Sequence, residues 1–241
     1  DALNLARKNP DRKVVFLAVG FETTAPTVAA TIKQAKVAGI ENFFALCGHK
    51  LVTPAMKVMV EDPELNISGF LCPGHVSAVI GERPYDFVTE DYRIPCVIAG
   101  FEPVDVLESL LMIVRQAAGR EEIRVQNEYS RTVKPEGNKV ALSLMEEIFE
   151  PVDTPWRGLG IIPVSGYGIS ENYRSFDAVV QITVEVEETK EHPGCICGSV
   201  LRGVKIPPEC ELFKDVCHPG NPVGPCMVST EGTCAAYFKY G

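Results

Sequence analysis

Six of the nine cysteines lie in the last 47 residues of the 241-residue chain. Their spacing is Cys-x-Cys, followed by twelve, six, eight and seven intervening residues. Zinc fingers and ribbons build their turns from Cys-x-x-Cys pairs, and this sequence contains none. Four thiolates at wide spacing in a loop-rich segment suit an iron–sulfur cluster. The sequence therefore predicts a thiolate-bound metal or cluster held by some of Cys195, Cys197, Cys210, Cys217, Cys226 and Cys234.

Zinc binding and disulfide-bonded or inert cysteines are the alternatives for this segment. The odd number of cysteines and their confinement to one end argue against a uniformly disulfide-stapled secreted domain. Cys195 and Cys197 are too close in sequence to be joint ligands of one cubane, so we expect one of them to drop out. His218 is a weaker substitute ligand, and His192 in its Pro-Gly turn is expected to face solvent.

A second group of chemically capable residues follows the predicted strands of the first half. Two strands run into Gly-Phe-Glu, and two others run into Cys-Gly-His and Cys-Pro-Gly-His. The carboxyl ends of parallel strands line the ligand crevice of an open sheet, with helix N-termini pointing at it. We therefore expect convergence on one edge, with His75 as the preferred proton carrier or ligand, of Glu22, Cys47, His49, Cys72, His75 and Glu102.

Each of these residues also has a structural interpretation. Thr23 or Thr24 ahead of Pro26 resembles a helix cap, and Glu22 and Glu102 suit helix N-termini. Buried, inert thiols are common after apolar strands, which is the favoured interpretation of Cys96.

The loop of residues 127–138 carries Arg131 and Lys134. It is either a solvated, salt-bridged loop or, if it folds over the crevice, a source of donors for an anion or an acidic partner.

These residues must be positioned by short apolar strands that alternate with helical patterns, which predicts an α/β fold with a parallel sheet under helices. The predicted strands are Val14–Val19, Phe43–Leu46, Ser68–Leu71, Cys96–Ala99 and Gly160–Ile162. The predicted helices are Pro26–Ala38, Val52–Val60, His75–Ile80, Pro103–Ala117 and Asn138–Phe149, and Phe176–Val186 is ambiguous but rich in β-formers. The predicted domains are an α/β domain at 1–118, the remainder of a split α/β domain at 119–190, and a cysteine-rich domain at 191–241.

Composition narrows the class of protein. The chain is 46% hydrophobic and 23% charged, which excludes a disordered tail protein. Its net charge of -9 argues against nucleic acid as a partner, because phosphate-backbone binding needs a basic stripe. No run of 18 uncharged apolar residues occurs, so no membrane span is predicted. The first residue is Asp1, and we expect a fragment of a longer protein.

Five long motifs, in order, resemble the HypD family of [NiFe]-hydrogenase maturation factors over essentially the whole chain. They are GFETTAPT, CPGHVSAVIG, VIAGFEP, NEYSRTVKPEGN and the stretch from GCICG through PPECELF to GPCMVSTEGTCAAY. The resemblance implies a Rossmann-like parallel sheet with helices on both faces and a small, loop-rich iron–sulfur domain. It also implies a cytoplasmic scaffold and redox component, rather than an enzyme that turns over alone.

The resemblance assigns roles residue by residue. It implies a [4Fe-4S] cluster bound by Cys197, Cys210, Cys217 and Cys234, with Cys195 as first reserve and Cys226 outside the required set. It places Glu22, Thr23, Thr24 and His75 as candidate catalytic residues at a cleft where an Fe(CN)2CO fragment is handled. The implied partners are the small chaperone HypC and the cyanide donor HypE.

The chain departs from the family pattern in one respect. Family members carry a Cys-Gly-Gly-His-Thr-His segment and a Cys-Pro-Val-Cys pair ahead of this region, and neither is in this sequence. We expect the cluster to relay electrons to those absent thiols. Two other functions remain as alternatives, which are an α/β ligand-binding or transferase-like domain with a zinc-stabilised tail and an interaction platform in which the tail only rigidifies a docking surface.

Overall fold

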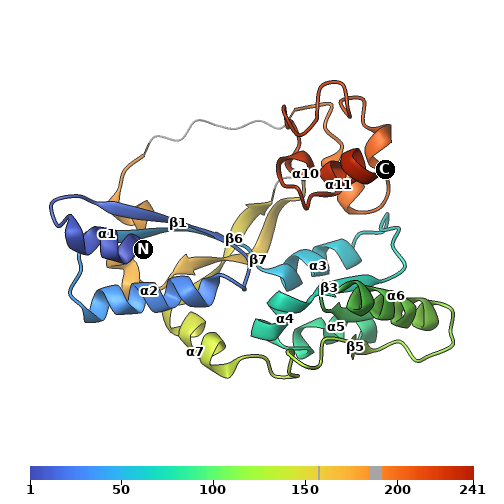
Figure 1. Cartoon of the computed structure of the whole chain (residues 1–241), viewed down its shortest axis with the longest axis horizontal. Coiled ribbons are helices and arrows are strands. Elements are labelled where there is room, and N and C mark those ends of the chain that lie inside the picture. The colour runs from blue at the N-terminus through green and yellow to red at the C-terminus, as the bar shows by residue number, and fades with distance from the viewer. Residues whose placement is uncertain (157, 185–191) are drawn as a thin grey trace. The chain divides into compact units, whose positions relative to one another are not determined.

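The computed structural model describes residues 1–156, 158–184 and 192–241 and shows a mixed α/β architecture with parallel sheets (Figure 1). The strands are β1 (Val14–Gly20), β2 (Phe43–His49), β3 (Phe70–Pro73), β4 (Cys96–Ala99), β5 (Val125–Asn127), β6 (Phe149–Trp156) and β7 (Gly160–Ile169). The helices are α1 (Ala2–Lys8), α2 (Ala25–Val37), α3 (Val52–Val60), α4 (Gly74–Ile80), α5 (Asp86–Glu90), α6 (Pro103–Ala117), α7 (Lys139–Ile148), α8 (Ala178–Gln181), α9 (Cys197–Leu201), α10 (Pro225–Val228) and α11 (Thr233–Tyr240). Short 3-10 helices occur at η1 (Arg83–Tyr85), η2 (Glu171–Phe176) and η3 (Pro207–Glu209).

The first sheet consists of β1 and β2, which pair in parallel from Val14 opposite Phe43 to Gly20 opposite His49. Pro26 lies in the first turn of α2, where its missing N–H costs no helical hydrogen bond. Helix α2 packs on both strands and on α7. Ile32 of α2 is fully buried in the same core as Phe43, so the apolar run of each strand and the helix between them close one βαβ layer.

The second sheet has the order β3-β4-β5, and all three strands are parallel. Strand β4 is central, and all four of its residues are buried, as expected for a strand covered on both faces. Tyr85 is fully buried in this core, and its hydroxyl lies 3.0 Å from that of Ser77. The two sheets are separate in the structure, which corrects the expectation of one sheet edge shared by all the strand ends.

The predicted elements of the first half are confirmed, with β3 displaced two residues from its predicted position. The second half differs more. Strand β7 is far longer than predicted, and its partner β6 was not predicted. The β interpretation of Phe176–Val186 is wrong for its first residues, because the Asp177 carboxylate accepts the Val179 N–H and caps α8. The end of that range lies outside the described residues.

Helix α6 has its polar side buried and its apolar side exposed. Gln116 is 1% exposed, donates to Gln126 at 2.7 Å and accepts the Arg124 N–H at 3.2 Å. Leu107 is 66% exposed, on the side where the helix also carries Val104, Leu111 and Val114. The periodicity of α6 therefore predicted the helix correctly but would have predicted the wrong face for the interior.

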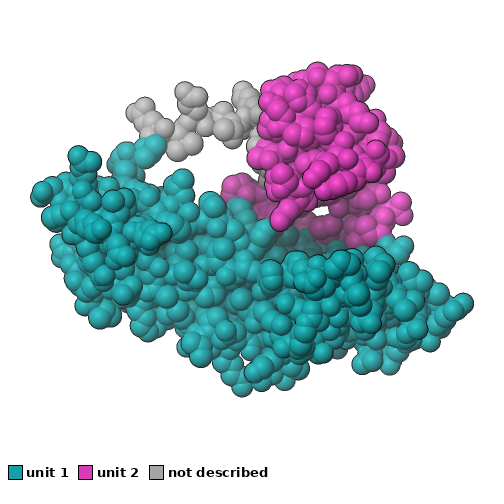
Figure 2. Space-filling view, in the orientation of Figure 1, with its two compact units in different colours: residues 1–57, 68–154, 163–184 teal, residues 58–67, 155–162, 185–241 magenta. Residues whose placement is uncertain are grey.

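The chain forms two compact units, each assembled from separate stretches (Figure 2). Unit 1 consists of residues 1–57, 68–154 and 163–184 and contains the two parallel sheets. Unit 2 consists of residues 58–67, 155–162 and the described part of 185–241. The three domains predicted from the sequence remain a prediction. None of the helices in the described ranges is long and apolar enough to cross a membrane.

A matched pair of substitutions tests whether the buried strand β4 contributes more to stability than the exposed face of α6. Ile98→Ala in fully buried β4 should lower the free energy of unfolding by about 2–5 kcal/mol, because it leaves a cavity. Leu107→Ala on the exposed face of α6 should change it by about 0.5 kcal/mol or less. Urea denaturation followed by circular dichroism measures both. Equal losses would show that α6 is buried against something in solution.

Candidate functional site

Glu22 lies in the loop between β1 and α2, and its side chain is buried. Its side chain is 3% exposed, and Oε1 accepts the Val52 N–H at 3.0 Å. Oε2 has no hydrogen-bond partner among the described residues. Burial raises the pKa of Glu22 above its ordinary value, opposed by the backbone hydrogen bonds. Glu22 is therefore a buried carboxyl with one oxygen on the α3 backbone and the other without a partner among the described residues.

The two threonines beside Glu22 differ from a simple helix cap. Thr24 is the residue before α2, but its hydroxyl donates to the carbonyls of Val19 and Phe21 at 3.3 and 3.2 Å. It therefore closes the loop after β1 instead of capping helix N–H groups. Thr23 is exposed.

Cys47 and His49 form a neutral pair at the end of β2. The Cys47 sulfur lies 3.4 Å from Nδ1 of His49, whose ring is fully buried. Burial lowers the pKa of His49 and raises the pKa of Cys47 to about 11. Nε2 of His49 has no hydrogen-bond partner among the described residues. This pair is therefore an imidazole beside a thiol rather than an activated thiolate.

His75 belongs to the predicted set at the second sheet and is exposed. It is the second residue of α4, and its ring stacks on Phe101 with centroids 3.9 Å apart. Gly74 lets the start of α4 lie close to the end of β4, because a Cβ there would overlap the Ala99 carbonyl. Phe101 in turn meets Tyr129 edge-on at 6.4 Å. The structure thus places an accessible imidazole at the carboxyl ends of three parallel strands.

Arg131 is engaged by carboxylates, which supports the salt-bridged interpretation of the loop of residues 127–138. It pairs with Asp105, and its other nitrogen lies 3.5 Å from Glu128. Asp105 also accepts the Glu102 N–H at 3.2 Å, and Glu128 accepts the Gly100 N–H at 3.0 Å. The hydrogen bond from Arg131 is the main cause that lowers the pKa of Asp105. The Gly-Phe-Glu corner after β4 is therefore fixed by one network.

The predicted strand-end residues divide between the two sheets. Glu22 follows β1, and Cys47 and His49 are among the last residues of β2, whereas His75 and Glu102 follow β3 and β4. Cys72 joins neither group. Its sulfur lies 3.2 Å from that of Cys96, and both side chains are buried, in agreement with the interpretation of Cys96 as a core thiol.

All six C-terminal cysteines line one cavity in unit 2. Apolar side chains complete its wall, among them Val200, Leu212, Phe213 and Met227. Short elements deliver the thiols, since α9 begins at Cys197, and Cys226 and Cys234 lie in the first turns of α10 and α11. The cavity residues are Cys195, Cys197, Cys210, Cys217, Cys226 and Cys234.

The environment of these sulfurs fits a cation with thiolate ligands. The hydrogen bond with Cys197 is the largest cause that raises the pKa of Cys226, and burial is the second. Burial is the largest cause that raises the pKa of Cys234 to about 11, and the neighbouring thiols contribute less. A metal would replace these protons and compensate the gathered negative charge. The Val223 N–H donates to the sulfur of Cys217 at 3.4 Å, a contact that stabilises cluster thiolates.

The cavity does not distinguish the four implied ligands from the other two cysteines. Cys226, outside the implied set, is 6% exposed and hydrogen bonds with Cys197. Cys195 lines the same wall. Among the described residues, no three His, Cys, Asp or Glu side chains are grouped so that they could hold a single metal ion. The ligand set of Cys197, Cys210, Cys217 and Cys234 remains a prediction.

The network at Asp105 should be visible in the pH dependence of stability. A lowered carboxyl pKa stabilises the fold above the ordinary carboxyl pKa, and this stabilisation is lost as the pH falls through the lowered value. Arg131→Gln should therefore lower the melting temperature at pH 7, and the difference from the unsubstituted chain should narrow between about pH 5 and pH 3. Arg174→Gln is the control, because its partner Glu171 is 80% exposed. A difference independent of pH would contradict this role of Asp105.

Known proteins are similar in sequence to this chain over its whole length. The HypD family profile, described as hydrogenase formation hypA family, matches residues 1–241. Hydrogenase maturation factor HypD of Cupriavidus necator is 46% identical over 249 residues, which cover 100% of this chain and 65% of that protein. Hydrogenase maturation factor HypD of Rhodobacter capsulatus is 45% identical over 247 residues, with 100% and 65% covered.

A third relative agrees, and all three are longer than this chain. Hydrogenase expression/formation protein HupD of Azotobacter chroococcum mcd 1 is 46% identical over 248 residues, which cover 100% of this chain and 65% of that protein. The chain thus spans 65% of the length of these three relatives. Because the family profile covers every residue and the relatives align over the full chain, the chain belongs to the HypD family of hydrogenase formation proteins.

Proposed function

We propose that this chain acts in hydrogenase maturation by holding a [4Fe-4S] cluster in unit 2 and by providing a substrate-handling surface in unit 1. The single observation that carries the proposal is the cavity lined by six thiols in a chain whose relatives are named hydrogenase maturation factors. When bound, the cluster would supply one-electron chemistry. The proposed ligands are Cys197, Cys210, Cys217 and Cys234, with Cys195 or Cys226 as a possible replacement for one of them.

The chain's own residues support the cluster in two ways. Apolar side chains such as Phe213 and Met227 line the wall, which limits water access to the sulfurs. Backbone N–H groups such as that of Val223 donate to sulfur, which favours the thiolate form. In unit 1, parallel strands each followed by a helix are compatible with a Rossmann-like arrangement.

The surface in unit 1 would handle an iron fragment with cyanide and carbon monoxide ligands, Fe(CN)2CO, as substrate. His75 and Thr23 are exposed and are the proposed contacts. Glu22, which is buried, and Thr24, which is exposed, act by holding the backbone in place. The carboxyl of Glu22 holds the start of α3 by accepting the Val52 N–H, and the Thr24 hydroxyl fixes the loop that carries Thr23. A small HypC-type chaperone and a HypE-type cyanide donor are the proposed partners, in a cytoplasmic compartment that keeps thiols reduced.

Metal analysis of the chain purified without oxygen tests the cluster. We expect about four iron and four sulfide per chain, with a broad absorption near 400 nm that bleaches on reduction with dithionite. One zinc per chain without colour would contradict the proposal and favour a ligand-binding domain with a structural zinc site.

Serine substitutions identify the ligands. Each single replacement of a proposed ligand by serine should remove most of the bound iron, because serine is a poor cluster ligand. The four positions are Cys197, Cys210, Cys217 and Cys234. Cys195→Ser and Cys226→Ser should retain it, and Cys96→Ser is the control for a buried thiol outside the cavity. Iron loss with Cys226→Ser but retention with Cys197→Ser would replace Cys197 by Cys226 in the ligand set.

His75→Ala separates the two proposed activities. It should leave the iron content of unit 2 unchanged, because His75 belongs to unit 1. In the full-length protein it should reduce hydrogenase maturation severalfold, measured as hydrogenase activity in a host that lacks its own copy. Unimpaired maturation would contradict the role of His75.

A further inference from the structure

One cavity-lining cysteine lies on a helix that is held by a residue far away in the sequence. Helix α9 presents Cys197 and Val200, three residues apart and therefore on one face, to the cysteine cavity. Cys197 is 4% exposed. The helix has only five residues, too few to be stable by itself. Its position must therefore be fixed by contacts outside its own hydrogen bonds.

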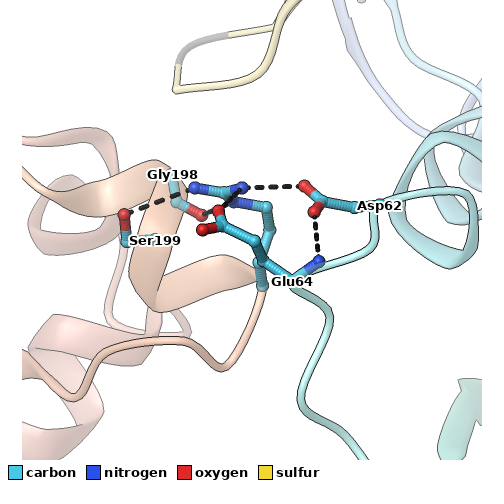
Figure 3. A network of polar contacts seen from close by, with 5 residues as sticks. Asp62, Glu64, Gly198 and Ser199 are labelled. Carbon is cyan, nitrogen blue, oxygen red and sulfur yellow. Dashed lines mark hydrogen bonds and ion pairs between the residues drawn. The ribbon is translucent and has the colours of Figure 1, made fainter.

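Those contacts converge on Arg202, the residue that follows α9. One of its terminal nitrogens donates to Asp62 at 2.7 Å and to Glu64 at 3.0 Å. The other donates to the Ser199 hydroxyl at 3.4 Å, and Nε donates to the Gly198 carbonyl at 3.3 Å. Figure 3 shows Asp62 on one side of the network and Gly198 and Ser199 on the other. One guanidinium thus joins α9 to residues about 140 positions earlier in the chain.

The carboxylate side of this clamp is itself ordered. Asp62 accepts the Glu64 N–H at 2.8 Å, and the Asn66 N–H donates to the Arg202 carbonyl at 3.2 Å. The Arg202 and Asp62 side chains are 24% and 20% exposed, so their ion pair is partly shielded from water, whereas Glu64 is 64% exposed. The hydrogen bond with Arg202 is the main cause that lowers the pKa of Asp62. The Asp62 contact is therefore the principal one.

Close backbone packing also holds α9, near its start and just after its end. Gly198 touches the turn at Gly158 so closely that a Cβ would overlap the Gly158 carbonyl. Gly203 has φ +69°, and a Cβ there would lie 2.8 Å from the Asn66 carbonyl oxygen. The helix is thus held between the segment around Asp62 and the turn at Gly158, all within unit 2.

We infer that Arg202 is a positioning residue, which holds α9 through Asp62 and thereby keeps Cys197 at the wall of the cysteine cavity. This inference rests on the proposed cluster function, and it adds residues 62–66 to the cluster-holding machinery. The sequence places these residues far from every cysteine of the tail.

Hydrogen exchange on the full chain tests the clamp without reference to any cluster. In Arg202→Gln, backbone amides of α9 should exchange about tenfold faster or more, because hydrogen bonds to a charged group are lost. Amides of α11 are the internal reference and should stay unchanged. Arg174→Gln in unit 1 is the matched control. Unchanged exchange in α9, or equal acceleration in α11, would overturn the inference.

Cluster release tests the link to Cys197. Iron loss to a chelator should be about tenfold faster in Arg202→Gln, and Arg202→Lys should restore part of the protection because it keeps one ion pair. Gly198→Ala keeps every charge but displaces α9, so it should also speed iron loss. Iron loss at the rate of the unsubstituted chain in both Arg202→Gln and Gly198→Ala would overturn the positioning role. If the unsubstituted chain holds no iron, the proposed function fails, while faster exchange in α9 would still support the clamp and unchanged exchange would refute it.

Discussion

Parallel pairing of β3, β4 and β5 is the constraint on which the chemistry of unit 1 depends. Because parallel strands end at the same edge, the residues that follow them must meet there. His75 after β3 stacks on Phe101 after β4, and Glu128 after β5 accepts the Gly100 N–H. The edge is stiff as well as crowded, since Arg131 joins that glutamate to Asp105 at the start of α6. The exposed imidazole of His75 is thereby held in a fixed position.

Unit 2 follows a different physical regime. Its elements are short, and its core is small, with Phe213, Cys217, Met227 and Ala235 as the buried members. A module of this kind has little hydrophobic stabilisation and depends on crosslinks, metals or polar anchors. Under the proposed function, a cluster bound by the cysteines and the Arg202 clamp would supply this stabilisation. The groups proposed to hold the cofactor would then also stabilise the fold of unit 2.

The local sequence predicted most of unit 1. Apolar runs gave β1, β2 and β4, and helical periodicity with Pro near the start gave α2 and α6. Prediction failed where a single contact decides the conformation. The Asp177 cap turns an apolar run into α8. Helix α6 was predicted with no buried face assigned, and its apolar pattern alone would not indicate that it buries Gln116 while exposing Leu107. In both cases, propensity and periodicity are weaker than a specific hydrogen bond or the partner that a face meets.

For the candidate site, the sequence by itself determined which residues carry chemistry, because cysteine clusters and Gly-Phe-Glu corners are recognisable from type and spacing. Only the tertiary structure decided which of them meet. It gathered six cysteines around one cavity, separated Glu22 from His75 by placing them at different sheets, and joined Asp62 to Arg202. The type of a residue determines which chemistry its side chain can perform. Proximity between distant segments depends instead on the packing of the whole chain, which no local pattern encodes.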